Sequence, residues 1–354
     1  MSGFALAVFL LSISIAPRAP NCTAVQATPD NATASETIVL PLELVANQPA
    51  TLAVLSADGH VMAAVKLVLS SGETITTDES GRAHFLAPPE TGVLYVRTTD
   101  SEVRAVTDVL PPGAAVNRDK ISVPFLVALK NPFSIRGRGF YGDADHNSVE
   151  IVEQPALVLA ASPLELIVLP SPQITPGIAD LVLKSASDVP LRITLVDVAS
   201  DASELQVRPG EKIQLSLRVN GTAQAVGLKI RNLSPQIAQF KLKRNQTLKT
   251  SGGVNNSAKL EVKGLRAGQF SFRAELAPSP GAPDVVAARD FLEAAQKIAP
   301  ENQRHSIASI LKELRPQAIH VAGARKKVEK LFMSSSPGDF SVLLEAARRA
   351  LLGD

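Results

Sequence analysis

Residues 211–221, EKIQLSLRVNG, indicate the fold class because apolar and polar side chains alternate along them. Successive side chains of a β-strand point to opposite faces of the sheet, so the alternation predicts a strand with one buried and one solvated face. Pro209 and Gly210 supply a turn just before it. The apolar positions are Ile213, Leu215, Leu217 and Val219, and the polar positions between them are Gln214, Ser216 and Arg218.

The same period of two recurs through most of the chain from about residue 37. Short alternating runs are separated by glycine turns at roughly 8–12-residue intervals, which is typical of antiparallel β-sandwiches. We therefore predict a mainly β chain of tandem Ig-like antiparallel β-sandwiches: a first module (37–112), a second module (118–187) and a third module (190–277). In the run TIVLPLELV, one face is predicted to carry Ile38, Leu40, Leu42 and Leu44.

After residue 284 the period changes to that of a helix. Apolar residues then recur in four stripes, each suited to one face of a helix. We predict a small α-helical tail over 283–354, with each apolar face covered by the other helices or by a partner. Ser336 is the predicted N-cap of the last helix, with Pro337 at its first position. Ile319 is assigned to the third stripe.

The N-terminus predicts export. Residues 4–16, FALAVFLLSISIA, are too short to span a membrane as a helix and suit the core of a signal peptide, which we place at 1–27. A linker over 28–36 follows. The alternatives are a buried N-terminal strand or helix, or a lipid anchor at Cys22. The expected location is secreted, cell-surface or periplasmic, with the membrane contacted only through the signal peptide.

The first module contains a hairpin with a recognisable pattern. TTDESGRAHF, residues 76–85, resembles the Thr-Asp-x-x-Gly-x-x-x-Phe hairpin of bacterial Ig-like and carboxypeptidase-regulatory-like domains. The resemblance implies that Asp78 and Gly81 make the turn and that Phe85 enters the core.

The second module has a more specific pattern. Its features are Ile135-x-Gly137-x-Gly139-Phe140, then a loop, then Val149-x-Ile151. This pattern is similar to that of IPT/TIG domains, the Ig-like modules found in bacterial exported proteins among others. That family is defined by its fold and its members bind different things, so the resemblance implies no particular activity.

The loop of the second module contains the one candidate cation site. Asp143, Asp145 and Asn147 stand at the first three ligand positions of an EF-hand-type loop. Ser148 and Gln154 occupy the positions where that loop needs Gly and Glu. We therefore expect a solvated turn between two strands, with a weak Ca²⁺ site as the alternative, and we predict no other cofactor.

The sequence contains no catalytic motif of the common hydrolase, metalloprotease or P-loop kinds. No two histidines share a spacing suited to a metal, and His84 is expected to point outward from a strand. The chain has no Trp and two Tyr, which argues against a carbohydrate or single-stranded nucleic-acid site built on stacking. We expect a protein without catalytic activity.

Charge is unevenly distributed along the chain. Residues 36–110 carry 10 acidic and 4 basic side chains, whereas residues 225–275 carry 2 acidic and 10 basic ones. A basic surface favours an anionic partner. A solvated face, or self-association with the acidic first module, would explain the same pattern. The candidate patch consists of Lys241, Lys243, Arg244, Lys249, Lys259 and Lys263.

These observations favour a non-catalytic exported binding, adhesion or spacer protein of the cell surface or periplasm. The expected partner is a protein or an anionic polysaccharide of the cell envelope, and nucleic acid is not expected. Two alternatives remain open: an accessory module of an exported polysaccharide-processing enzyme, or a structural component of an envelope assembly. The oligomeric state is not predicted.

Overall fold

The computed structural model describes residues 36–100, 104–113, 121–184, 187–201, 205–242, 247–277, 283–315, 318–336 and 338–353. The predicted signal peptide with Cys22, and all of the predicted linker except Glu36, lie outside the described residues. Within residues 34–354 the chain forms one compact unit.

The first module is a sandwich of two sheets with an apolar core between them. One sheet contains β1 (Thr37–Val39), β3 (Pro49–Leu55) and β6 (Arg82–Leu86). The other has the order β2 (Glu43–Val45), β8 (Arg104–Leu110), β7 (Gly92–Thr98), β4 (Lys66–Leu69) and β5 (Thr74–Thr76).

The run TIVLPLELV does not form the single strand that its alternation predicts. It divides into β1 and β2, which belong to different sheets. Pro41 lies between them, and proline has no N–H to donate to a β-ladder. As a result Leu44 joins the core of the sandwich, whereas Leu42 packs among the C-terminal helices. The prediction that one face carries all four apolar residues is therefore wrong at Leu42.

The hairpin of the first module follows its predicted pattern. The Asp78 carboxylate accepts hydrogen bonds from the backbone N–H groups of Ser80 (2.8 Å) and Arg82 (3.1 Å). Gly81 has φ +73°, and a Cβ there would lie 2.6 Å from Val61 Cβ, so glycine is required on both counts. Phe85 is buried in the core, as predicted.

The second module also has two layers, and one of them continues the first module. β13 (Leu157–Ser162) pairs with β3 through Ala161 and Thr51, and β14 (Glu165–Leu169) and β10 (Phe133–Arg136) follow it in the same sheet. The other layer contains β12 (Gln154–Pro155), β11 (Val149–Ile151), β15 (Gly177–Leu183), β16 (Ser187–Ser200) and β9 (Leu126–Ala128). Phe140 is buried in the core between the layers.

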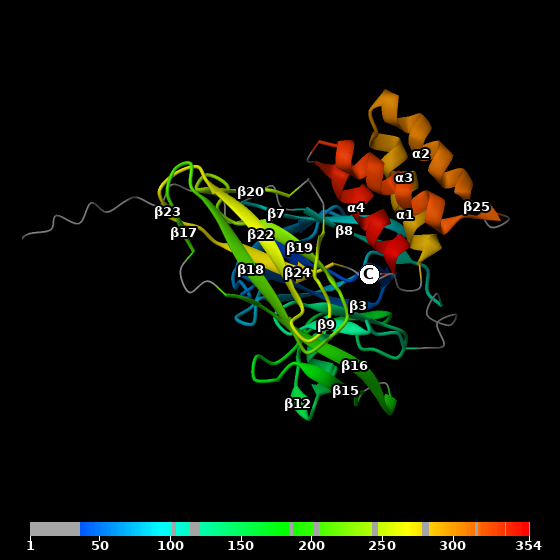
Figure 1. The fold of residues 1–354 in the computed structure, drawn as a ribbon. Coiled ribbons are helices and arrows are strands. Elements are labelled where there is room, and N and C mark those ends of the chain that lie inside the picture. Colours follow the sequence, from blue (N-terminus) through cyan, green and yellow to red (C-terminus); the bar gives the residue numbers. More distant parts are fainter. Residues whose placement is uncertain are drawn as a thin grey trace, which may run out of the picture. The chain divides into compact units, whose positions relative to one another are not determined.

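The third module shares a strand with the second. The first part of β16 pairs with β15, and residues 197–200 of the same strand pair with β18 (Lys212–Asn220) (Figure 1). β22 (Ser257–Gly264) and β20 (Ala238–Phe240) complete that sheet. Facing strands of the module are β21 (Leu248–Lys249), β19 (Gly227–Asn232) and β24 (Phe272–Leu276), and β17 (Gln206–Val207) pairs with β23 (Gly268–Gln269). One continuous strand therefore connects the two modules.

Four helices follow, drawn as orange to red coils in Figure 1: α1 (Val285–Ile298), α2 (Glu301–Glu313), α3 (Val321–Ser334) and α4 (Asp339–Leu352). Two details differ from prediction. Ile319 lies in a short hairpin of β25 (Leu314–Arg315) and β26 (Ala318–Ile319) rather than in a helix. The N-cap of α4 is Gly338 rather than Ser336, and the hydroxyl of Ser341 caps it by accepting from the Gly338 N–H at 3.1 Å.

The helical tail packs on the first module. Leu42 and Val106, on the outer side of that sandwich, join the core of the helices, and Val93 and Tyr95 pack beside them. At the edge of this contact Arg104 pairs with Asp339 at 2.6 Å. The apolar helix faces are therefore covered by the sibling helices and by this sheet. No described helix has the length and apolarity needed to cross a membrane.

The described residues thus form a mainly β protein of sandwiches, antiparallel except at the pairs β2–β8 and β9–β16, followed by a small helical region. This confirms the predicted fold class.

Candidate functional site

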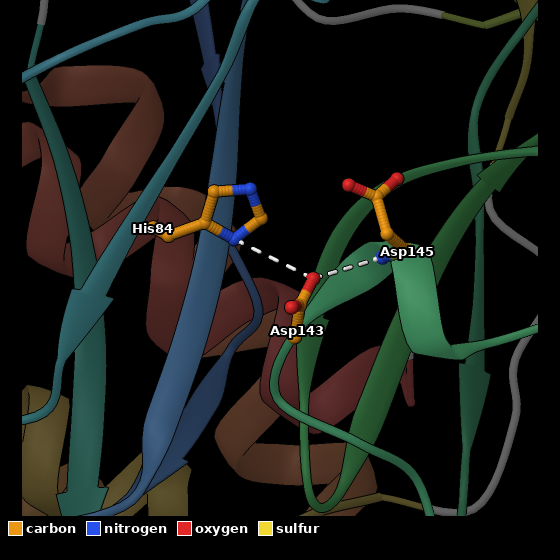
Figure 2. A group of neighbouring side chains, drawn as sticks. All are labelled: His84, Asp143 and Asp145. Carbon is orange, nitrogen blue, oxygen red and sulfur yellow. Dashed lines mark hydrogen bonds and ion pairs between the residues drawn. The ribbon is translucent and has the colours of Figure 1, made fainter.

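A polar cluster lies where the first module meets the second (Figure 2). His84 comes from β6, and Asp143 and Asp145 come from the loop around a single 3₁₀ turn, η2 (Ala144–His146). One ligand atom from each of these three side chains lies within 4.8 Å of the other two. Arg82 and Thr51 complete the group, which we name the junction cluster.

The loop is held by its own side chains. Asp143 Oδ1 accepts from the backbone N–H of Asp145 at 3.0 Å and so caps the turn. The amide of Asn147 donates to the carbonyls of Tyr141 (2.7 Å) and Asp143 (2.8 Å), and its oxygen accepts from the Tyr141 N–H (3.0 Å). Asn147 is buried and its polar atoms are committed to the loop. It does not join Asp143 and Asp145 as a third ligand.

Thr51 fixes the tautomer of His84. The Thr51 hydroxyl donates to the carbonyl of Gly142 at 2.8 Å and accepts from the N–H of Ala144 at 3.1 Å. Its single hydrogen is therefore used, so His84 Nδ1, at 3.0 Å, acts as the donor to the same hydroxyl. In the neutral imidazole this leaves the lone pair on Nε2.

Arg82 already supplies a cation to the cluster. Its Nη2 lies 2.6 Å from Asp145 Oδ1, and its Nη1 donates to the carbonyl of Val158 at 3.3 Å. The Arg82 side chain is only 11% exposed, whereas that of Asp145 is 60% exposed, so packing fixes the guanidinium while the carboxylate stays open to water. A metal ion at Asp145 would have to compete with a guanidinium that is held in place.

Asp143 lies between two histidines. His146 Nδ1 is 2.9 Å from its Oδ2, and His84 Nδ1 is 3.6 Å from its Oδ1. Partial burial acts to raise the pKa of Asp143, but the Asp145 N–H and the two imidazoles outweigh it and hold that pKa below its ordinary value. Asp143 therefore stays ionised between the two imidazoles.

The junction has a second polar contact and an apolar seam. Buried Glu165 accepts a hydrogen bond from the backbone N–H of Leu42, and its other oxygen lies 3.6 Å from Nε of Arg136. Around these groups, one apolar cluster draws on both modules, with Val39, Ala53 and Leu55 from the first and Leu159, Ala160 and Ile167 from the second.

The junction cluster therefore holds two modules together through charge and hydrogen bonds. The spacing of Asp143 and Asp145 marks them in the sequence, but nothing there marks His84, because β6 and η2 are far apart in the chain and no local spacing links them. The outward direction predicted for His84 is correct, but the side chain meets the neighbouring module there.

The structure separates the residues of the predicted basic patch. Lys259 and Lys263 lie on the exposed face of β22, and Lys241 follows β20 at the edge of the same sheet. Lys249 lies on β21, in the facing sheet. Lys243 and Arg244 lie outside the described residues.

No protein-family model matches the sequence, and no curated protein matches it. Among solved structures, the chain is similar to SGBP-B of the Bacteroides ovatus mixed-linkage glucan utilization locus, in complex with a mixed-linkage heptasaccharide (12% identity, 74% of this chain and 63% of that chain, TM-score 0.17). It is also similar to invasin, a bacterial integrin-binding protein (11%, 68% and 56%, TM-score 0.18), and to a three-Ig structure of titin (10%, 69% and 94%, TM-score 0.16).

The chain spans less than two thirds of the first two of these proteins. The strand order, the strand registers and the apolar cores of the described residues establish the fold.

Proposed function

We propose that the chain is an exported, non-catalytic binding or adhesion protein whose modules form a stiff scaffold. The observation that carries this proposal is β16, a strand of 14 residues that serves the sheets of two modules without interruption. Domains joined by flexible linkers move relative to one another by default. A shared strand removes that freedom, because bending there requires ladder hydrogen bonds to break.

The junction of the first two modules supports the same proposal. Bonds cross it at Thr51, Arg82 and Glu165. The backbones also approach closely, since a Cβ on Gly142 would lie 1.7 Å from the carbonyl oxygen of Pro49. A stiff chain suits a protein that holds its binding surfaces at fixed separations, and this property would also serve a spacer.

Export to the cell surface or periplasm is proposed from the apolar N-terminal run alone. The second module is proposed to be an IPT/TIG-type domain, on the glycine pattern after Ile135 and the buried Phe140. The proposed partner is a protein or an anionic polysaccharide of the cell envelope, without metal or cofactor.

Two other functions remain as alternatives. An accessory module of an exported polysaccharide-processing enzyme would bind glycan beside a catalytic partner. A structural component of an envelope assembly would hold a stable protein neighbour.

Two measurements on the purified full chain test the proposal. In the first, the chain is incubated with envelope fractions and with neutral and acidic glycans, and both retention and new reducing ends are followed. Saturable retention with no new reducing ends is expected. Release of reducing ends that tracks the purified protein would overturn the non-catalytic assignment.

The second measurement addresses stiffness. Spin labels are placed on exposed positions of successive modules, as Glu90→Cys with Gln154→Cys and as Gln154→Cys with Lys259→Cys, in a chain lacking Cys22. Narrow distance distributions are expected for both pairs. Broad distributions for either pair would contradict the stiff scaffold.

A further inference from the structure

The outer face of the β18–β22–β20 sheet is positively charged. The inner side chains of β18 and β22, such as Leu215, Leu260 and Val262, are buried in the core of the third module. Strand alternation therefore turns the side chains between them outward. The exposed lysines on this side are Lys212 on β18 and Lys259 and Lys263 on β22.

Two of these lysines are direct neighbours. Lys212 and Lys263 occupy opposite positions of the antiparallel pair β18–β22. Like charges that face each other across strands are destabilising. Among the described residues, no ion pair is found for Lys212, Lys259 or Lys263.

Two acidic groups on this face are already paired with cations, and Glu211, next to Lys212 in the chain, accepts from the backbone N–H of Arg208 at 2.7 Å. Glu261, between Lys259 and Lys263 on the outer side of β22, lies 3.0 Å from Nζ of Lys241. Asp201 lies 2.7 Å from Nε of Arg218 at the other end of β18. Three ammonium groups therefore remain on this face without an ion pair among the described residues.

The rest of the face is neutral and polar. Gln214 pairs with Glu261, Ser216 with Lys259, and Gln239 on β20 with Lys263. The outward positions of these three strands carry no large apolar side chain. Interfaces between proteins are centred on aromatic or aliphatic anchors, and amphipathic membrane-binding surfaces insert apolar side chains. Both kinds of anchor are missing from the outward positions of these strands.

We propose that this face, named here the lysine face (Lys212, Lys259 and Lys263 with Gln214, Ser216 and Gln239), binds an acidic polysaccharide. Ammonium groups would pair with its carboxylate or sulfate groups, and the amide and hydroxyl side chains would bond its hydroxyls. The inference rests on the proposed binding function and names the ligand class.

The lysines that share this face differ from those that the charge count along the sequence indicates. Lys249 is on the facing sheet and Lys241 is paired with Glu261, so neither is a main contributor. Lys212 replaces them, although it lies outside the basic segment 225–275. A strand pairing, rather than a local run of charge, brings the three lysines together.

The test measures binding of the full chain to immobilised polygalacturonate over a range of salt concentrations. The comparison probes are a neutral glucan, polyglutamate and vesicles of anionic phospholipid. The test variant is Lys212→Gln/Lys259→Gln/Lys263→Gln. The matched control is Lys66→Gln/Lys249→Gln/Lys312→Gln, which removes three exposed lysines of the described residues elsewhere.

We expect the wild-type chain and the control to bind polygalacturonate, and salt to weaken both because exposed charge contacts are screened. The test variant is expected to lose roughly tenfold in affinity, the scale of three exposed charge contacts. A variant with arginine at the three positions is expected to bind as the wild type does.

Equal binding by the test variant and the wild type, or an equal loss in the control, would overturn the proposal. Stronger binding to polyglutamate or to vesicles would assign the face to a different class of partner and overturn it as well. If envelope fractions retain the wild type and the test variant alike, the lysine face is not the binding surface, while the proposed binding function stands.

Discussion

Asp108 on β8 and Asp290 on α1 face each other where the helical tail covers the first module. The Asp108 residue is 0% exposed, and no N–H or O–H donor of the described residues reaches either of its carboxyl oxygens. A proton shared with Asp290 is therefore the bond available to it. Burial, the charge of Asp290 and that of Asp284 raise the pKa of Asp108 to about 8.

This pair predicts that the tail docks less firmly as pH rises. The ordinary pKa of an aspartate is 3.8, so between about pH 4 and pH 8 the folded protein holds a proton that the unfolded chain releases. The contribution is fully present below pH 3.8, is lost progressively as pH rises through this window, and is gone above about pH 8. The free energy of unfolding should fall by up to about 1.4 kcal/mol per pH unit within this window. Urea unfolding at a series of pH values measures this fall in unfolding free energy. Hydrogen exchange of the α1 amides at the same pH values reports how firmly the tail is docked.

Asp108→Asn supplies the decisive comparison. An amide keeps the shape, stays neutral and donates to Asp290 without taking up a proton. The variant should show a flatter dependence on pH between about pH 5 and pH 8. Asp290 also faces Glu293 and Arg289 on its own helix, and burial raises its pKa too. The control is Asp58→Asn, at an exposed site, which should keep the wild-type slope of unfolding free energy against pH. A wild-type slope in Asp108→Asn would refute the shared proton.

Asn147→Asp separates the two interpretations of the loop after β10. A calcium loop should gain affinity when a carboxylate replaces an amide at a ligand position. In the structure, the change removes two donors and places a charge against the carbonyls of Tyr141 and Asp143. We expect a loss of about 2–3 kcal/mol in unfolding free energy and no Ca²⁺ response. Calorimetric titration with Ca²⁺, before and after the substitution, decides between them; tighter binding in the variant favours the calcium loop.

Local patterns predicted the strands and helices well, because periodicity reports which face of an element is buried. The stripe of α1, for example, appears in its buried residues Phe291, Leu292 and Ala295. Periodicity does not tell which other element packs against each buried face. Leu42 and Leu44 look equivalent in sequence, yet one meets helices and the other meets a sheet.

The candidate site shows the same limit. Asp143 and Asp145 stand out by their spacing, but His84, Thr51 and Arg82 reach them only through the contact between modules. Buried acids such as Asp108 and Glu165 resemble surface residues in a sequence, since their burial depends on elements more than 100 positions away.

Glu165→Ala should weaken the junction of the first two modules. The carboxylate is 2% exposed, accepts from Leu42 and lies beside the guanidinium of Arg136. Its loss leaves a buried backbone donor without that acceptor, and we expect about 3 kcal/mol less stability in urea unfolding. Glu165→Gln keeps an acceptor and should lose less. The control is Glu150→Ala, which removes the exposed pair with Lys184 and should lower the unfolding free energy by under about 1 kcal/mol. Equal losses in Glu165→Ala and Glu150→Ala would show that the buried Glu165 contact stabilises the junction no more than a surface ion pair does.

Gly142→Ala tests the close approach of the two modules by adding one methyl group. The new Cβ would lie 1.7 Å from the carbonyl oxygen of Pro49, and that oxygen belongs to backbone, which cannot rotate away. Either the loop before η2 or the start of β3 must move, and overpacking of this kind costs about 3 kcal/mol. We expect a lower unfolding free energy. We also expect a broader distribution of distances between spin labels at Glu90→Cys and Gln154→Cys. Gly72→Ala provides the contrast: φ there is +92° but nothing lies within 4 Å, so it should cost about 1 kcal/mol of backbone strain and leave the distances unchanged. A Gly142→Ala protein with wild-type stability and a narrow distribution would mean that the modules are not held as closely as the structure places them.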